Sequence, residues 1–292
     1  MPEPKISWLI EKEVFDDGTS ERIADIVKSL GLGCKIIDNV AFHGGLGAWA
    51  YSELFPEDDS CVIAYGSINL CMRLREAPWT PTAWFPLWDM RCSSYYAHWG
   101  RFLLQQEYAF LPWAELPRRK GFLLKALGKN GSLFVRPDSN AKTFTGTVVH
   151  KEKFEHWVGM TQECYSPTPD SLVVVARPRT VLREWRFIVR RGEVVAGSLY
   201  KDDGESRIAS WSCDPDPHSP ASLALAVAKD PWQPAPIYVV DVCEVPGDQR
   251  FRLLEMGSAN CAALYGCDLD RFVQSCNAQA KADWLDIHGE QG

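Results

Sequence analysis

The 292-residue chain is 46% hydrophobic and 24% charged, a balance typical of a globular protein with a sizeable core. Its net charge of −7 argues against a broad basic surface for phosphate backbones, so no nucleic-acid partner is expected. No stretch approaches the roughly 20 apolar residues of a membrane span, and the N-terminus lacks the basic start and apolar core of a signal peptide, so we expect a cytoplasmic protein without membrane contact.

The first 100 residues predict a small subdomain with a parallel sheet. Ile6–Ile10 and Cys34–Ile37 are short apolar runs typical of strands, and Val62–Tyr65 predicts a third strand. The segment between the first two runs has hydrophobic residues at helical spacing after a cap at Thr19 or Ser20. A strand, a helix and a strand within this length favour a parallel α/β layer.

Two further segments of this part carry less regular patterns. His43–Gly47 is glycine-rich but lacks the Lys-Ser/Thr pair of a P-loop, so we expect an ordinary loop there. Residues 76–95 are rich in proline and tryptophan and are expected to be irregular. A helix is then predicted around Tyr95–Gln106.

Residues 101–292 are predicted to form a second, strand-rich α+β region. The turn Arg190–Glu193 is typical of a β-hairpin between two of its strands. Seven apolar runs predict strands, at Leu133–Val135, Gly146–Val149, Leu172–Ala176, Trp185–Val189, Val194–Tyr200, Ile237–Val242 and Phe251–Met256.

Helices and loops of the second region follow from caps and composition. Residues 201–236 are polar and acidic, and we expect a loop that serves either as a lid or as a surface segment. Within it, Ser219 and Pro220 begin a predicted helix over Ala221–Ala228. A last helix is predicted from Asp268 or Asp270 to about Asn277. The ten cysteines are scattered without a CxxC pair, which indicates reduced thiols and no zinc site.

Two acids lie within apolar strands of this region. Asp241 is in the run Tyr238–Val242, and Glu255 is in the run Phe251–Met256. A charge inside a buried strand is costly unless it is paired or binds a metal. A hairpin through Pro246–Asp248 would set the two acids side by side, where a divalent cation such as Mg²⁺ would relieve their repulsion. Ordinary ion pairs with arginine or lysine are the alternative, and the residues alone leave both open.

Three basic residues could meet at one place. Arg136 ends an apolar strand, Lys142 lies in the loop that follows, and Arg186 begins another strand. Glu184 is two residues before Arg186 and therefore points to the same face of that strand. Together the three cations could contact a triphosphate, Arg through forked bonds and Lys as a point charge.

These residues resemble those of ATP-grasp enzymes, most closely the clade in which two arginines and a lysine replace the usual phosphate lysines. The resemblance extends over about residues 100–275 and implies an ATP-grasp fold, with a small N-terminal parallel α/β subdomain (1–100) before the nucleotide-binding and catalytic region (101–292). The motifs occur in the expected order, as Arg136-Pro137, Lys142-x-Phe144-x-Gly146, Glu184-Trp185-Arg186, Tyr238–Val242 and Leu254-Glu255.

The resemblance also implies roles for individual residues. Arg136 and Lys142 would hold the phosphates of ATP, Arg186 would face the γ-phosphate, and Lys201 would add a phosphate contact. Glu184 would accept hydrogen bonds from the ribose hydroxyls. The residues implied as the hinge at the adenine are Val174, Val175, Ala176 and Arg177, and those implied as magnesium ligands are Asp241, Glu255 and a third residue.

The identity of that third ligand is where the chain departs from the family. The family's Glu-x-Asn pattern puts an Asn two residues after the metal-binding Glu, whereas Gly257 follows Glu255 and Met256 here. Ser258 or Asn260 would have to replace it, and Asn260 is the candidate we select.

The function implied is an ATP- and Mg²⁺-dependent ligase that joins a carboxylate to an amine, forming an amide or peptide bond through an acyl phosphate. Its partners would be small-molecule or peptide acids and amines. Gly257 keeps a non-catalytic ATP-binding module open as an alternative. A phosphotransferase that uses the same cleft is a second alternative.

Overall fold

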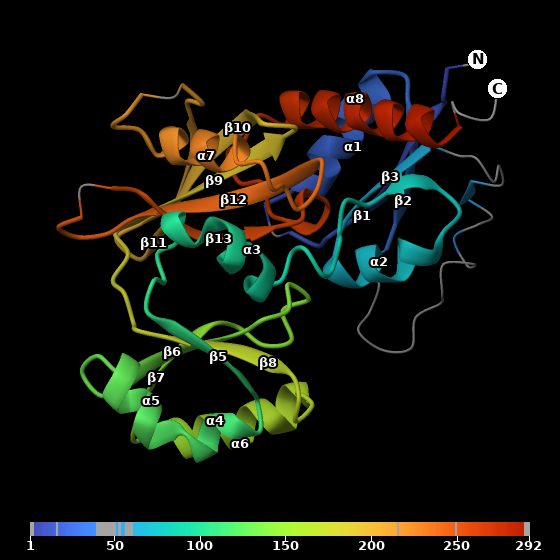
Figure 1. Cartoon of the computed structure of the whole chain (residues 1–292). Coiled ribbons are helices and arrows are strands. Elements are labelled where there is room, and N and C mark those ends of the chain that lie inside the picture. The colour runs from blue at the N-terminus through green and yellow to red at the C-terminus, as the bar shows by residue number, and fades with distance from the viewer. Residues whose placement is uncertain are drawn as a thin grey trace.

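The computed structural model describes residues 3–15, 17–38, 51, 54–55, 61–214, 216–248 and 250–288. One parallel sheet and two antiparallel sheets, with helices packed on them, make up the described chain (Figure 1). This architecture confirms the prediction of an α/β part combined with an α+β part. The glycine-rich segment His43–Gly47 lies outside the described residues.

The N-terminal sheet is parallel, as predicted, with the strand order β2-β1-β3-β4. Helix α1 connects β1 to β2 and buries one apolar face. Strand β4 was not predicted, because its sequence Thr-Pro-Thr lies in the segment expected to be irregular, and it pairs with β3 through three residues. The elements are β1 (Ile6–Glu11), α1 (Thr19–Ser29), β2 (Gly33–Ile37), β3 (Cys61–Tyr65), α2 (Ile68–Arg73), η2 (Leu74–Glu76) and β4 (Thr80–Thr82).

A four-stranded antiparallel sheet with three helices forms a separate lobe, seen at the bottom of Figure 1. Its strand order is β5-β8-β6-β7, and it has its own apolar core around Leu116, Leu133 and Phe154. The elements are β5 (Tyr108–Pro112), α4 (Glu115–Arg118), α5 (Lys120–Leu127), β6 (Ser132–Pro137), β7 (Thr147–His150), α6 (Phe154–Tyr165) and β8 (Leu172–Ala176).

The segment before this lobe is less helical than predicted. Helix α3 spans Cys92–Trp99 and is followed by the short 3-10 helix η3 at Gly100–Phe102, so the helix expected around Tyr95–Gln106 begins earlier and ends sooner. The chain leaves helical geometry at Leu103, whose ψ is 145°, and Leu104 N donates to Leu253 O at 2.8 Å. This bond attaches the entry of the lobe to the largest sheet.

The largest sheet is antiparallel, with the order β11-β10-β9-β12-β13. The predicted hairpin at Arg190–Glu193 is confirmed, with Arg191 and Gly192 at positive φ in the turn. The predicted pairing through Pro246–Asp248 is also confirmed. The elements are β9 (Arg183–Arg190), β10 (Glu193–Asp202), β11 (Glu205–Trp211), α7 (Pro220–Ala228), β12 (Ile237–Glu244), β13 (Arg252–Gly257), η4 (Ala259–Cys261) and α8 (Leu269–His288).

Strand β11 lies in the segment that was expected to be a loop. Six of its seven residues are exposed, so the strand has no apolar pattern that sequence analysis could detect. It is held by its antiparallel pairing with β10 after a turn at Asp203 and Gly204, both at positive φ. The helix predicted over Ala221–Ala228 is confirmed, with Ser219 accepting from Ala221 N at the N-cap.

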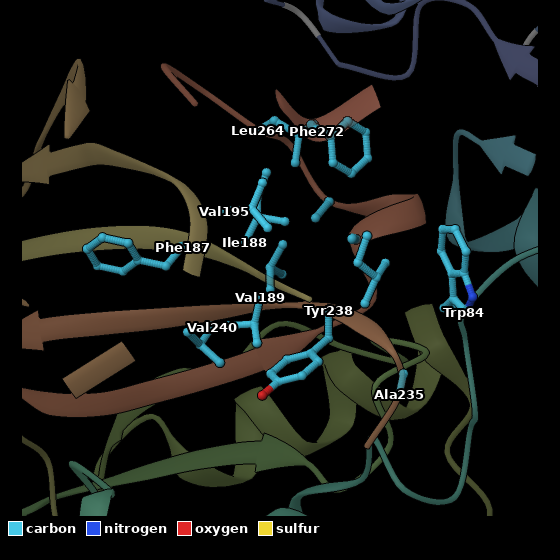
Figure 2. Close-up of a cluster of buried hydrophobic side chains, with 14 of the residues drawn as sticks. Trp84, Phe187, Ile188, Val189, Val195, Ala235, Tyr238, Val240, Leu264 and Phe272 are labelled. Atoms are coloured by element: carbon cyan, nitrogen blue, oxygen red, sulfur yellow. The ribbon is translucent and has the colours of Figure 1, made fainter. Parts of the chain in front are cut away.

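Large apolar side chains bind the biggest sheet to its neighbours (Figure 2). Phe187 and Val240 are fully buried on the adjacent strands β9 and β12, and Phe272 joins the same core from α8. Burial of a side chain of this size contributes on the order of 1.5–3 kcal/mol. The strands that carry the charged residues described below are therefore firmly placed.

Helix α8 is longer than predicted and returns to the N-terminal sheet. It packs on α1 and β3 (Figure 1), and its buried residues Phe272, Cys276, Ala280 and Trp284 repeat every four positions. This stripe continues beyond Asn277, the predicted end. Because α8 joins the first and last parts of the chain, the division at residue 100 stays a prediction. No described helix combines the length and apolar character that crossing a membrane would need.

Candidate active site between two sheets

Three neighbouring strands of the largest sheet place charged side chains next to one another. Asp241 on β12 is the register partner of both Arg186 on β9 and Glu255 on β13. The Arg186 guanidinium donates from Nε to Asp241 Oδ1 at 2.8 Å and from Nη2 to Oδ2 at 2.7 Å. Arg186 and Asp241 are 8% and 2% exposed, so they form a buried, forked ion pair.

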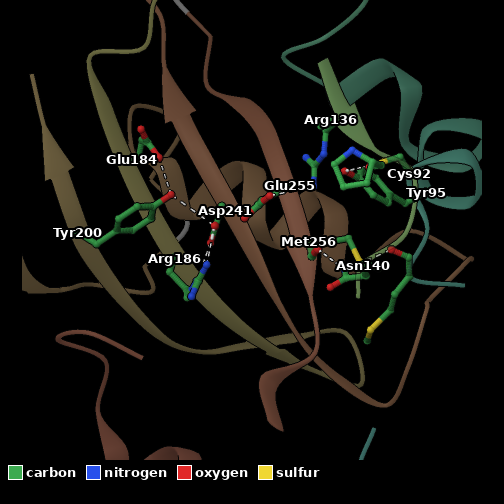
Figure 3. A network of polar contacts seen from close by, with 12 residues as sticks. Cys92, Tyr95, Arg136, Asn140, Glu184, Arg186, Tyr200, Asp241, Glu255 and Met256 are labelled. Atoms are coloured by element: carbon green, nitrogen blue, oxygen red, sulfur yellow. Dashed lines mark hydrogen bonds and ion pairs between the residues drawn. The ribbon is translucent and has the colours of Figure 1, made fainter. Parts of the chain in front are cut away.

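The separate lobe adds a second arginine to this arrangement. Arg136, near the end of β6, donates from Nη2 to Glu255 Oε2 at 3.0 Å (Figure 3). Arg186, Asp241, Glu255 and Arg136 thus form one group of charges across two sheets, and we call these four residues the charged row. The expectation that the two acids lie side by side is confirmed by their register.

A tyrosine links the charged row to Glu184. The Tyr200 hydroxyl on β10 donates to Glu184 Oε2 at 2.6 Å and lies 3.4 Å from Asp241 Oδ2 (Figure 3). Lys201 Nζ is 3.4 Å from Glu184 Oε1. Tyr265 stacks on Tyr200 with ring centroids 4.7 Å apart, so the two rings cover one end of the row. This network holds Glu184 at the edge of the cavities described next.

The pKa values of the two acids in the row shift in opposite directions. Burial raises the pKa of Asp241, Arg186 offsets this only in part, and Glu255 raises it further. Burial also acts to raise the pKa of Glu255, but Arg136, Lys142 and Arg186 outweigh it and lower that pKa. Glu255 is therefore the acid whose negative charge is better stabilised.

Two cavities meet at the charged row. One, of about 300 Å³, has an apolar wall formed by Tyr96, Phe134, Phe144 and Leu254. The other, of about 550 Å³, extends past Asp241 towards the N-terminal sheet. Both are lined by Arg136, Lys142, Thr145, Tyr200 and Glu255. A ligand with a flat apolar part and a charged tail would fill the first cavity and present its tail to the second.

The donor set of the row suits a hard cation supplied together with a ligand. Among the described residues, no group of three or more Asp, Glu, His or Cys side chains gathers as a complete metal site. Mg²⁺ in proteins is commonly held by one or two carboxylates, with waters and substrate phosphates completing its shell. Asp241 and Glu255, adjacent in register, fit that arrangement.

The structure brings most of the predicted phosphate and ribose contacts to these cavities. Lys142 lines both of them, is exposed, and has no hydrogen bond or ion pair within the described chain. Glu184 lines the first cavity, while Arg186 and Lys201 line the second. Their side chains are thus in place around one space, as the sequence pattern predicted.

The predicted adenine hinge is not brought to either cavity. Val174, Val175 and Ala176 are fully buried in β8, where each pairs with β5 on one side and β6 on the other. Their backbone groups are thereby used within the sheet. Arg177 forms an ion pair with Glu107 at 2.6 Å.

Asn260, the predicted third metal ligand, is used elsewhere. Its Nδ2 donates to Ala64 O at 2.7 Å, and its Oδ1 accepts from Trp84 N at 2.9 Å. The residue is 2% exposed and lines neither cavity. Both ends of the amide thus connect η4 to the N-terminal sheet, and the structure does not bring it to the acids.

Substituting Asn260 by alanine is expected to lower the free energy of unfolding by about 2–4 kcal/mol. Ala64 O and Trp84 N would each lose this buried partner. Urea unfolding would measure the change, with Gln274→Ala at an exposed position of α8 as the control, expected within about 0.5 kcal/mol of the parent. Equal stability of the two variants would contradict the structural role of Asn260.

Sequence reasoning missed several residues of the site. Tyr200 and Tyr265 were not singled out because tyrosines near strand ends are common in ordinary cores. Asn140, whose side chain contacts β13, was seen only as part of a polar loop. Gln105 lines the first cavity while its Oε1 is buried without a hydrogen-bond partner. In each case only the tertiary structure gives the neighbours that matter.

The family follows from a comparison with known protein families. Residues 122–275 match the model of an ATP-grasp domain, family 2 of the clade named for its two arginines and one lysine. The chain belongs to this ATP-grasp family. The matched segment holds all four residues of the charged row. No curated protein matches the sequence.

Solved structures with the same fold support the ATP-grasp architecture over nearly the whole chain. A D-cycloserine synthetase, DcsG, superposes with a TM-score of 0.62 at 14% identity, covering 94% of this chain and 99% of its own. The D-alanine–D-alanine ligase of Bacillus anthracis gives 0.58 at 12% identity, covering 99% and 100%. The ATP-grasp ligase PsnB, solved with a minimal precursor, gives 0.55 at 12% identity, covering 95% and 100%.

Proposed function

We propose that this ATP-grasp protein is an ATP- and Mg²⁺-dependent ligase that joins a carboxylate to an amine through an acyl phosphate. The observation that carries the proposal is the charged row, which lies between two sheets where two cavities meet. The solved ligases of the same fold support ligation as the reaction class.

The nucleotide fits the first cavity. Its apolar wall, which includes Phe134 and Leu254, suits the flat face of adenine, and Glu184 at the same cavity suits the ribose hydroxyls. Arg136 and Lys142 lie where the two cavities join, so the phosphates would extend along them into the second cavity. We therefore place the base in this cavity rather than at the backbone of Val174–Arg177.

The second cavity then holds the acid and the amine. An oxygen of the substrate carboxylate attacks the γ-phosphorus, the bond to the β-phosphate bridging oxygen breaks, and ADP leaves. The amine nitrogen attacks the acyl carbon, inorganic phosphate leaves, and the nitrogen gives up a proton. Arg186 and Lys201 line this cavity and would stabilise negative charge on the transferred phosphoryl group.

The remaining chain contributions concern position and charge. Asp241 and Glu255 would hold Mg²⁺, which when bound neutralises phosphate charge. Arg186 keeps Asp241 ionised and oriented through its forked contact. Tyr200 and Tyr265 cover the end of the row, which keeps water from the reacting atoms.

The direct test is release of ADP and phosphate by the purified protein with MgATP and panels of acids and amines, together with detection of the amide by mass spectrometry. A coupled product for any pair supports the ligase. A phosphorylated product that persists with every amine would identify a phosphotransferase instead. ATP binding without turnover across the panels would favour the non-catalytic module.

Replacing Lys142 by alanine is expected to raise the KM for ATP about tenfold, with a smaller change in kcat. Lys142 is exposed and unpaired within the described chain, so its loss removes phosphate attraction without disturbing the fold. Steady-state ADP release would measure this. The matched control is Lys125→Ala on the exposed face of α5, for which KM should not change. Equal KM values for both variants would remove Lys142 from the nucleotide site.

A further inference from the structure

Asn140 holds its carboxamide in a fixed orientation beside strand β13. Its Nδ2 donates to Met256 O at 2.9 Å and to Met90 O at 3.2 Å (Figure 3). Both hydrogens of the amide nitrogen are therefore used. The amide oxygen, Oδ1, accepts no hydrogen bond from the described residues. Asn140 lines the second cavity, so this oxygen is available to a ligand there.

The carboxamide lies on the same face of β13 as Glu255. Gly257 is two residues beyond Glu255 in that strand, so a side chain at 257 would point to the face that carries the acid. A Cβ built on Gly257 would lie 3.7 Å from Asn140 Oδ1 and 3.8 Å from its Nδ2. The amide of Asn140 thus lies where a side chain of residue 257 would begin.

Three protein oxygens then face one cavity without a full set of internal partners. Glu255 uses one carboxylate oxygen for Arg136, and no described residue donates to its Oε1. Asp241 and Asn140 line the same cavity, and carboxamide oxygens are good ligands for hard divalent cations. Because both Nδ2 hydrogens are engaged, the amide would reach a cation without first breaking a contact of its oxygen.

We propose that Asn140 supplies the third protein oxygen to the divalent cation that accompanies the nucleotide. It does so from the loop after β6, in place of a side chain at position 257. The inference rests on the proposed function, since it concerns the cation of the same site. It also explains how a glycine is tolerated two residues after Glu255. A purely structural clamp between β13 and the segment at Met90 is the competing account of Asn140.

The test measures binding of Mn²⁺, as a probe of the magnesium site, by electron paramagnetic resonance in the presence of a non-hydrolysable ATP analogue. Asn140→Ala should weaken Mn²⁺ binding about tenfold or more. The double variant Asn140→Ala/Gly257→Asn should recover most of that loss, because φ at Gly257 is not positive and a Cβ there makes only ordinary contacts. A clamp would not be restored by a new amide at 257, so absence of rescue would overturn the proposal.

A second measurement needs no variant that could misfold. Protein labelled with ¹³C in the asparagine side chains should show hyperfine coupling between bound Mn²⁺ and a carboxamide carbon. An unlabelled sample gives the baseline, and absence of coupling in the labelled parent protein would overturn the assignment.

Glu255→Gln separates this inference from the proposed function. If Glu255→Gln removes Mn²⁺ binding while Asn140→Ala leaves it intact, only the role of Asn140 fails. If both leave it intact, the cation site and the proposed function fail together.

Discussion

Arg186→Met should lower the free energy of unfolding by about 3–5 kcal/mol, the cost typical of breaking a buried ion pair from one side. Asp241 is 2% exposed and takes both of its short arginine contacts from Arg186. Without that arginine its charge would be buried next to Glu255, its register partner. Denaturant unfolding followed by tryptophan fluorescence would give the change, which is large against the roughly 5–15 kcal/mol of a typical domain.

Two comparisons make this result specific to the buried pair. Arg207→Met breaks an exposed ion pair with Asp202 and should cost less than about 1 kcal/mol. The double variant Arg186→Met/Asp241→Leu removes both buried charges and should recover much of the lost stability. If Arg186→Met unfolds at the same denaturant concentration as the parent, the forked pair does not stabilise the folded protein.

Glu255→Gln is expected to reduce turnover about 10²–10³-fold, with the fold retained. Glutamine keeps the shape of the side chain but loses the charge that Arg136 and Lys142 stabilise. It therefore removes the acid best suited to hold a cation at the phosphates. Release of ADP at saturating MgATP would measure the loss, and circular dichroism would check that secondary structure is unchanged.

The matched control for Glu255 is Glu244 on the neighbouring strand. Glu244 pairs with Arg183 at 2.8 Å, and its side chain is 28% exposed, the same fraction as that of Glu255. It lines neither cavity at the charged row. Glu244→Gln therefore loses a comparable ion pair without a predicted effect on turnover. An equal fall in both variants would mean that Glu255 acts only through the stability of the sheet.

Much of the site was visible in the sequence because charges in apolar strands are rare. Asp241 and Glu255 each interrupt a run of residues that must be buried, and the hairpin between them fixes their distance. Glu184 and Arg186 share a face because strands alternate with a period of two residues. The predicted geometry of the acids followed from these local rules alone.

The third metal ligand and the adenine contacts could not be found in the same way. Asn260 is close to Glu255 in sequence, yet its amide is consumed by Ala64 and Trp84. Asn140 is distant from Glu255 in sequence and reaches β13 through a long-range contact with Met256 O. Sequence proximity favours the wrong amide of the two, because nothing local records which groups already have partners.

Secondary structure shows the same division. The sequence by itself determined the strands of the large sheet other than β11, the turn at Arg190–Glu193 and the acids that face each other across β12 and β13, since these depend on periodicity and turn chemistry within a few residues. Only the tertiary structure decided that exposed β11 pairs with β10 and that Arg136 meets Glu255. Those outcomes depend on hydrogen-bond partners and charges brought together by packing, which no local pattern encodes.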